Sequence, residues 1–402
     1  MPRVNADILI WARENAGLAS EDAIQKLGIR EARSVPPLDR LAALESGEVE
    51  PTRPMLVKMA KVYRRPLVTF YMSRPPRIGD RGEDFRTLPA DHAAEADVIL
   101  DALLRDVRAR QSMVRAVLED EEENTPFPFI GSKEVGDGFG DVAQSIRESL
   151  EFALGEYRRF HADDEAFAFL RNKAEAAGIF VLLVGNLGSY HTAIDLETFR
   201  GFAISDDIAP FIVINDQDAK AAWSFTLLHE LAHLWLGQTG VSGASAERRI
   251  ERFCNDVAGE LLVPGDELGE LRAAIRRGLD VTAEAIGVFA GDRNVSRSMV
   301  AYKLFRADLI DHQTWQELSN LFRQQWLNNR AAARERARDA DGGPNYYVVR
   351  RHRVGAALID LVRRMTANGA LTTTKAGKVL GVKPKNVELL IRRQLIINAP
   401  GT

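Results

Sequence analysis

The sequence HELAH at residues 229–233 lies inside an apolar segment, WSFTLLHELAHLWLG, whose pattern predicts a helix from about residue 218 to residue 235. Positions i and i+4 of a helix share a face, so the imidazoles of His229 and His233 can reach one point in space. Two imidazoles placed in this way can hold a zinc ion, and Glu230 between them can deprotonate the water that the ion binds. The motif therefore predicts a Zn²⁺ site with Glu230 as the general base.

A third ligand must come from another part of the chain. A metzincin requires glycine and histidine three and six residues after the second histidine, and Leu236 and Thr239 stand there, so that class is excluded. The alternative is a glutamate on the next predicted helix, AERRIERFCNDVAGELLVP, which offers Glu247, Glu251 and Glu260.

Among these glutamates we favour Glu251. Asn255, four residues on, shares its face and can orient a metal-binding histidine through the ring nitrogen that does not face the metal. Glu260 is nine positions from Glu251, about 180° around the helix, and should point away from the site. Cys254 is a possible soft ligand, but a small buried hydrophobic residue is the better interpretation.

Residues 1–75 alternate short helical patterns with turns, which predicts a helix-turn-helix bundle. Between residues 51 and 79 there are seven basic residues and no acidic one, so this stretch either contacts phosphates or forms a solvated helix face. The segment expected to read DNA, LDRLAALESG, offers only Asp39, Arg40 and Glu45 as polar readers, which is unusual for a major-groove helix. The module is therefore expected to bind DNA weakly or to dock a partner or a second copy.

The rest of the chain predicts an α+β protein that is mostly helical. Residues 76–164 read as a linker and a long helix, and residues 165–325 as the zinc peptidase domain. A small sheet is expected from the apolar runs at residues 179–184, 201–205 and 211–215. Residues 326–402 read as a basic helical C-terminal module.

The net charge of −4 hides an asymmetry. Residues 330–402 carry 15 Lys and Arg against 5 Asp and Glu, a charge of +10, which leaves −14 for residues 1–329. Within this segment LTTTKAGKVLGVKPKNVELLIRR has the spacing of a second helix-turn-helix-like pair, flanked by lysines and arginines. It is the best candidate for touching nucleic acid, and a small packing module with a solvated basic face is the alternative.

The single cysteine, Cys254, cannot form an intramolecular disulfide. Charged residues interrupt the first seventeen residues, MPRVNADILIWARENAG, where a signal peptide would need an apolar stretch, and no apolar run approaches the ~18–20 residues of a membrane span. We therefore expect a cytoplasmic protein with no membrane partner.

Several motifs in order resemble those of the ImmA/IrrE metallopeptidases, peptidase family M78, in the version with an N-terminal XRE-type helix-turn-helix. The resemblance covers most of the chain. ILIWARENAGL and LAALESGEVEPTRPMLVKMAKVYRRPLVTFYM resemble the helix-turn-helix, and DFRTLP resembles the linker. RGFAISDDIAPFIVIN and FTLLHELAHLWLG resemble the catalytic core, and IERFCNDVAGELLVP the helix of the third ligand.

The resemblance implies a cytoplasmic, gluzincin-like endopeptidase that cleaves a dedicated DNA-binding repressor and induces stress, mobile-element or phage-defence genes. Carried over by position, His229, His233 and Glu251 would bind zinc and Glu230 would be the general base. The family often has arginine where Trp223 stands and tryptophan in the segment that holds Leu44-Glu45 here. These departures bear on the choice of substrate and leave the zinc set intact.

Two further expectations concern the substrate. A strand such as residues 201–205 could pair with an extended substrate backbone. Tyr190 or His191, in the loop before that strand, could stabilise the oxyanion, or they could be ordinary polar loop residues.

Three functions follow from these patterns. The first is a zinc endopeptidase that acts on a repressor or antitoxin-like partner, a small helix-turn-helix protein encoded nearby. The second is a transcriptional regulator or antitoxin whose peptidase fold only senses a ligand. The third is a housekeeping peptidase of broad specificity. DNA is a candidate partner, which the protein would contact through residues 51–79 and 330–402. A second copy of the chain is another candidate, in a homodimer.

Overall fold

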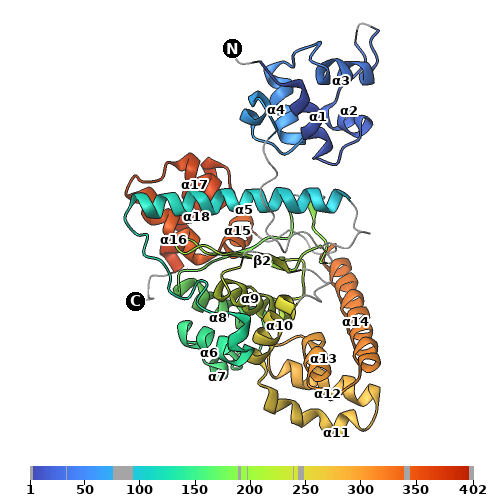
Figure 1. Cartoon of the computed structure of the whole chain (residues 1–402), viewed down its shortest axis with the longest axis vertical. Coiled ribbons are helices and arrows are strands. Elements are labelled where there is room, and N and C mark those ends of the chain that lie inside the picture. Colours follow the sequence, from blue (N-terminus) through green and yellow to red (C-terminus); the bar gives the residue numbers. More distant parts are fainter. Residues whose placement is uncertain are drawn as a thin grey trace. The chain divides into compact units, whose positions relative to one another are not determined.

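The computed structural model describes residues 3–32, 34–75, 94–188, 192–196, 198–238, 240–242, 249–338 and 345–397. The chain divides into two compact units, Met1–Arg105 and Asp106–Thr402. Each unit is described by itself. Figure 1 shows that helices dominate and that the strands gather in one small sheet, which confirms the predicted α+β, mostly helical class.

The smaller unit is a bundle of short helices. They are α1 (Ala6–Glu14), α2 (Ser20–Leu27), α3 (Pro37–Glu45), α4 (Arg53–Val62) and a 3-10 helix at Leu67–Tyr71. Their apolar faces form one core, which includes Ile8, Ala12, Leu41 and Met59. Residues that favour helix ends stand between these helices in the sequence. Gly28 ends α2 in the left-handed conformation, and Thr52 caps α4 by accepting a hydrogen bond from the Met55 N–H.

One of the expected polar readers is not on the surface. Glu45 is 9% exposed and accepts hydrogen bonds from Arg13 Nε and Nη2 at 2.7 and 3.1 Å. The two residues form a bidentate pair that ties α1 to the end of α3. Glu45 is therefore a structural residue, and among the three predicted readers only Asp39 and Arg40 remain at least partly exposed.

The larger unit contains the remaining elements. Before the sheet come α5 (Ala94–Asp120), which begins in the smaller unit, α6 (Phe139–Ser149), α7 (Leu154–Tyr157) and α8 (Asp163–Ala176). Within and after the sheet come α9 (Lys220–Trp235), α10 (Arg249–Leu262), a 3-10 helix at Gly265–Leu271, α11 (Arg272–Ile275), α12 (Leu279–Gly291), α13 (Arg297–Arg306) and α14 (His312–Arg338). The chain closes with α15 (Tyr346–Val354), α16 (Ala356–Ala367), α17 (Thr373–Leu380) and α18 (Pro384–Ile397).

The sheet has four strands in the order β1-β3-β2-β4. They are β1 (Phe180–Leu183), β2 (Gly201–Ile204), β3 (Phe211–Ile214) and β4 (Gly240–Ser242). β1 pairs with β3 in parallel, whereas β2 is antiparallel to both β3 and β4. All residues of β1, β2 and β3 are buried, as expected for strands that are covered on both faces. The three predicted strands are present, and β4 is an addition.

The main core surrounds α9. This helix packs against α8, α10 and the strands β2 and β3, and twelve of its sixteen residues are buried. Trp235 is fully buried, stacks on Phe129 and donates a hydrogen bond from its indole N–H to Ser145 Oγ at 3.0 Å. Because α9 is apolar on all sides, its few polar side chains lie in a dry interior.

The C-terminal helices pack on the same core. The Arg171 guanidinium of α8 donates to the carbonyl oxygens of Val181 and His352 and to Glu175 Oε1. Glu175 Oε2 accepts hydrogen bonds from the N–H groups of Ala356 and Ala357, at 3.0 and 3.1 Å, and thereby caps α16. The predicted boundary between residues 325 and 326 falls inside α14, which is continuous there.

No helix in the described part of the chain is both long and apolar enough to cross a bilayer.

Candidate metal centre

The predicted zinc motif lies in the middle of α9, and its polar side chains are buried. His229 is 4% exposed, and Glu230 and His233 are fully buried. The helix α10 packs directly against α9 and brings Glu251, 6% exposed, to the same place. Two neighbouring helices therefore supply three ligand groups to one dry interior position.

The three ligand groups surround a common point. His229 Nε2 lies 3.2 Å from Glu251 Oε2, His233 Nε2 lies 3.2 Å from Glu251 Oε1, and the two Nε2 atoms are 3.1 Å apart. Among the residues that the structure describes, this is the group of histidine, cysteine and acidic side chains close enough to share a metal ion. Glu251 is the glutamate that the helical phase favoured.

These distances fit a small divalent cation. Ligands at 2.0–2.1 Å from a tetrahedral zinc would be about 3.3–3.4 Å from one another, close to the separations here. Glu251 Oε1 has no aligned hydrogen bond although His233 is 3.2 Å away, which indicates that the groups face a common centre more than they face each other. A bare pair of imidazole nitrogens 3.1 Å apart also requires a proton or a cation between them.

The electrostatics of the site favour positive charge. Burial alone would raise the pKa of Glu251, but its close polar contacts with His229 and His233 and their charges hold this pKa far below the usual range. Burial disfavours the charged form of His233, yet Cys254, Glu251 and Glu230 together raise the pKa of His233 well above its ordinary value. A carboxylate that stays ionised at this depth can help neutralise a bound cation.

The strand β2 passes close to the predicted general base. A Cβ built on Gly201 would lie 2.8 Å from Glu230 Oε1 and 2.7 Å from Thr226 Cγ2, so only a glycine fits here without displacing a neighbour. The close approach fixes the carboxylate of Glu230 between α9 and the sheet. No sequence pattern predicts this contact, apart from a glycine at the start of a predicted strand.

The environment of the histidine Nδ1 atoms differs from the expectation. Neither His229 Nδ1 nor His233 Nδ1 has a hydrogen-bond partner in the described structure, so the predicted orienting bond from Asn255 is not formed. The Asn255 side chain interacts with the Tyr302 hydroxyl instead. Cys254, fully buried as expected, lies against His233, a contact that the sequence did not predict.

The other candidates lie elsewhere. Glu260 Oε2 pairs with Lys303 Nζ at 3.2 Å and is not part of the cluster. Glu247, Tyr190 and His191 lie outside the described residues, so the alternative ligand and the two oxyanion candidates stay predictions.

The proposed substrate strand is already paired on both sides. β2 is hydrogen-bonded to β3 along one edge and to β4 along the other, with Phe202 opposite Val213 and Val241. An added substrate strand therefore has no open edge on β2, because β4 occupies it. This corrects the expectation that residues 201–205 receive the substrate backbone in the conformation described.

Comparison with known proteins assigns this part of the chain to a family. Residues 184–305 match the family model of Peptidase M78, described as the IrrE N-terminal-like domain, and the match includes β2, β3, α9 and α10. No curated protein and no solved structure matches the chain. The matched range contains all four buried residues of the site and supports a metallopeptidase-type enzyme. Residues 184–305 are therefore a domain similar to the M78 peptidases of the ImmA/IrrE type.

Proposed function

We propose that this protein is a cytoplasmic zinc endopeptidase that cleaves one DNA-binding repressor or antitoxin-like partner, a small helix-turn-helix protein encoded nearby, and so controls stress, mobile-element or phage-defence genes. The observation that carries the proposal is the convergence of His229, His233 and Glu251 within 4.8 Å, beside Glu230, in a domain of peptidase type. We assign the first three residues to zinc and the fourth to proton transfer.

The residues divide the chemistry between them. Zinc held by His229, His233 and Glu251 would supply a water of lowered pKa and a positive charge for the carbonyl oxygen. Glu230, one position along α9 from His229, would take the proton of the attacking water and pass it to the leaving nitrogen. Gly201 keeps the Glu230 carboxylate in place, since its missing side chain leaves room for Oε1.

Burial of the site supports selectivity for one partner. The four residues are at most 6% exposed, and β4 pairs with β2, the strand that approaches Glu230 at Gly201. A polypeptide chain must open this arrangement before it can reach the site, which disfavours a peptidase of broad specificity. Casein or short-peptide turnover without a partner would support that broad function instead.

Cleavage of the neighbouring gene product tests the proposal. The purified protein and the nearest small helix-turn-helix protein should yield one defined cut that Glu230→Gln abolishes while metal content stays unchanged. A wild-type protein that never cuts this partner, even with zinc bound, would contradict the proposal. Size-exclusion chromatography with light scattering would at the same time decide whether the protein is a homodimer.

The second candidate function is a DNA-binding regulator that uses the peptidase fold as a sensor. It is supported by the exposed cations of the C-terminal helices, Lys375, Lys378, Lys383, Lys385 and Arg392. In the stretch 51–79, Arg53, Lys61 and Arg74 are also exposed, whereas Arg77 lies outside the described residues. Tight operator binding by a protein that cleaves nothing would favour this function.

A further inference from the structure

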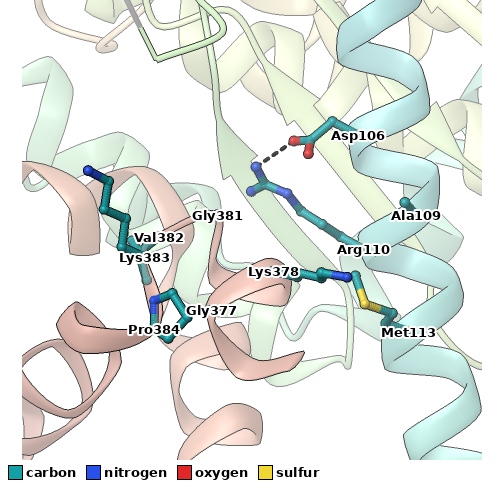
Figure 2. A pocket seen from close by; sticks show the side chains of 10 residues that line it. All are labelled: Asp106, Ala109, Arg110, Met113, Gly377, Lys378, Gly381, Val382, Lys383 and Pro384. Carbon is teal, nitrogen blue, oxygen red and sulfur yellow. Dashed lines mark hydrogen bonds and ion pairs between the residues drawn. The ribbon is translucent and has the colours of Figure 1, made fainter. Parts of the chain in front are cut away.

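A pocket of about 520 Å³ lies between α5 and the α17–α18 pair, far in sequence from the metal centre. Figure 2 shows α5 on one side of it, with Asp106 and Arg110, and the turn from α17 to α18 on the other. Lys378, Gly381, Lys383 and Pro384 belong to that second wall. None of the lining residues falls in the range that matches the peptidase family, so the pocket needs an explanation of its own.

Two guanidinium groups converge at the pocket. A Cβ built on Gly381 would lie under 3.0 Å from both Arg110 Nη2 and Arg350 Nη2, so these two nitrogens are less than 6 Å from each other. Gly381 itself ends α17 in the left-handed conformation, which favours glycine for a second reason. Like charges this close repel strongly unless an anion lies between them or beside them.

The protein neutralises these cations only in part. Arg350 donates to the carbonyl oxygens of Leu380 and Gly381, which are dipoles without net charge. Arg110 pairs through Nη2 with Asp106, whose side chain is 49% exposed. Of the lining residues Asp106 alone is acidic, against Arg110, Lys378 and Lys383, with the Arg350 guanidinium beside them.

Arg110 also has hydrogen-bonding capacity left over. It is 8% exposed, and its Nε has no hydrogen-bond partner in the described structure. An unsatisfied donor on a buried cation is costly, and an incoming acceptor would remove that cost. Burial and, next, the charge of Arg110 lower the pKa of Arg350 to about 10, so the charged form of Arg350 is disfavoured beside Arg110.

The geometry points to a phosphate-binding pocket, in which a phosphate group contacts Arg110 and Lys378 and screens Arg110 from Arg350. Phosphate offers up to two negative charges and several acceptors, and guanidinium groups recognise it well. The first turn of α18 borders the pocket at Pro384, so the positive end of this helix dipole also favours an anion there. The phosphate comes either from a nucleic-acid backbone or from a free phosphate compound.

Binding measurements on the full-length protein test the pocket. Calorimetry with pyrophosphate and fluorescence anisotropy with a short labelled DNA duplex are run on wild type and variants at low salt. Arg110→Gln should weaken binding about tenfold or more, because it removes a buried charge that contacts the phosphate. Lys378→Gln, at an exposed position, should weaken it less and guards against misfolding of the Arg110 variant.

Lys385→Gln is the matched control, since Lys385 is an exposed cation of α18 that does not line the pocket. It should leave pyrophosphate affinity within about twofold of wild type. If duplex binds, is displaced by pyrophosphate and is weakened by Arg110→Gln, the phosphate belongs to nucleic acid. If only pyrophosphate binds and the same variant weakens it, the ligand is a free phosphate compound.

The proposal is overturned if neither probe binds wild type, or if Arg110→Gln and Lys378→Gln bind like wild type. It is also overturned if Lys385→Gln weakens pyrophosphate binding as much as the pocket variants do. The result does not depend on the peptidase activity, because Glu230→Gln should bind both probes as wild type does.

Discussion

At the scale of single residues, the metal centre depends on two kinds of constraint. His229, Glu230 and His233 are set by their spacing on one helix, so any chain with this motif on a helix brings them together. Glu251 and Gly201 come from other elements, and each is held by packing: α10 against α9, and β2 across α9. Substitutions at these two positions test the packing more sharply than substitutions in the motif.

Replacing Gly201 by alanine should reduce cleavage without removing the metal. The added methyl group would collide with Glu230 Oε1 and Thr226, and so shift the carboxylate that transfers the proton. A displacement of this kind costs roughly 100-fold in rate when it misplaces a catalytic group. We expect a fall in kcat of about that size for the partner protein, together with wild-type metal content by mass spectrometry.

Gly269→Ala is the control for Gly201→Ala, because a Cβ at Gly269 meets no atom within 4 Å. It should leave kcat unchanged. If Gly201→Ala cleaves as fast as wild type, Glu230 is not held by this contact.

Replacing Glu251 by glutamine should remove the metal itself. Glutamine keeps the size of the side chain but lacks the negative charge of the carboxylate that lies against His229 and His233. The loss in zinc affinity should exceed the about 10–100-fold typical of groups outside the ligand set. Equilibrium dialysis with zinc would measure it, and Glu260→Gln, which alters only the pair with Lys303, should bind zinc as wild type does. Equal zinc affinity in both variants would exclude Glu251 as a ligand.

The sequence predicted the part of the site that depends on local periodicity. The zinc motif follows from helical spacing, and the structure brings Glu251 to it, although the bond from Asn255 for which Glu251 was favoured is not formed. The contact of Gly201 with Glu230, and that of Cys254 with His233, join elements whose mutual placement no local pattern encodes. Glu45 illustrates the same limit, because its burial depends on Arg13, thirty-two positions away.

At the scale of elements, local sequence patterns do not predict the short and irregular segments. β4 has three residues, too few for a period-2 pattern, yet it closes the edge of β2. The 3-10 helix at Gly265–Leu271 is a second short segment of this kind, and it joins other parts of the larger unit. It carries Glu267, which accepts hydrogen bonds from Arg158 Nη1 at 2.9 Å and from Arg293 Nε at 2.7 Å.

Glu267→Gln should lower stability at neutral pH and not at acid pH. Burial opposes ionisation, but Arg158 and Arg293 together lower the pKa of Glu267. The contribution of the ionised group is therefore complete above the unfolded pKa of about 4.3, and it is lost as pH falls through the folded pKa. We expect a cost of about 1 kcal/mol at pH 7, or about 2 °C in Tm, that vanishes near pH 3.

Thermal unfolding followed by circular dichroism at both pH values measures this difference. Glu270→Gln is the matched control, because within the described residues Glu270 forms an ion pair with Arg293 and its side chain is 58% exposed. A Glu267→Gln variant that is as stable as wild type at pH 7, or that remains destabilised near pH 3, would contradict the electrostatic role.

At the scale of the whole molecule, the charge asymmetry suggested a separate basic end, and the structure distributes those charges differently. Several arginines of the C-terminal helices are used within the larger unit: Arg353 pairs with Asp216 at 2.6 Å, and Arg364 with Glu123 at 2.8 Å. Composition cannot reveal such pairs, because they join residues more than a hundred positions apart. Among the side chains of this segment that the structure describes, the exposed cations lie on α17, on α18 and in the turn between them.

Glu175→Gln should loosen the attachment of the C-terminal helices to the peptidase core. Glu175 both neutralises the buried Arg171 guanidinium and caps α16 through the N–H groups of Ala356 and Ala357. Removing one partner of a buried ion pair lowers the free energy of unfolding by about 3–5 kcal/mol, because the other charge is left uncompensated. Hydrogen exchange measured by mass spectrometry should therefore rise across α15 and α16 while α9 stays protected. Asp360→Asn, at a partly exposed position of α16 itself, should leave exchange unchanged. An equal rise in α9 would show that Glu175 supports the whole unit instead of this junction.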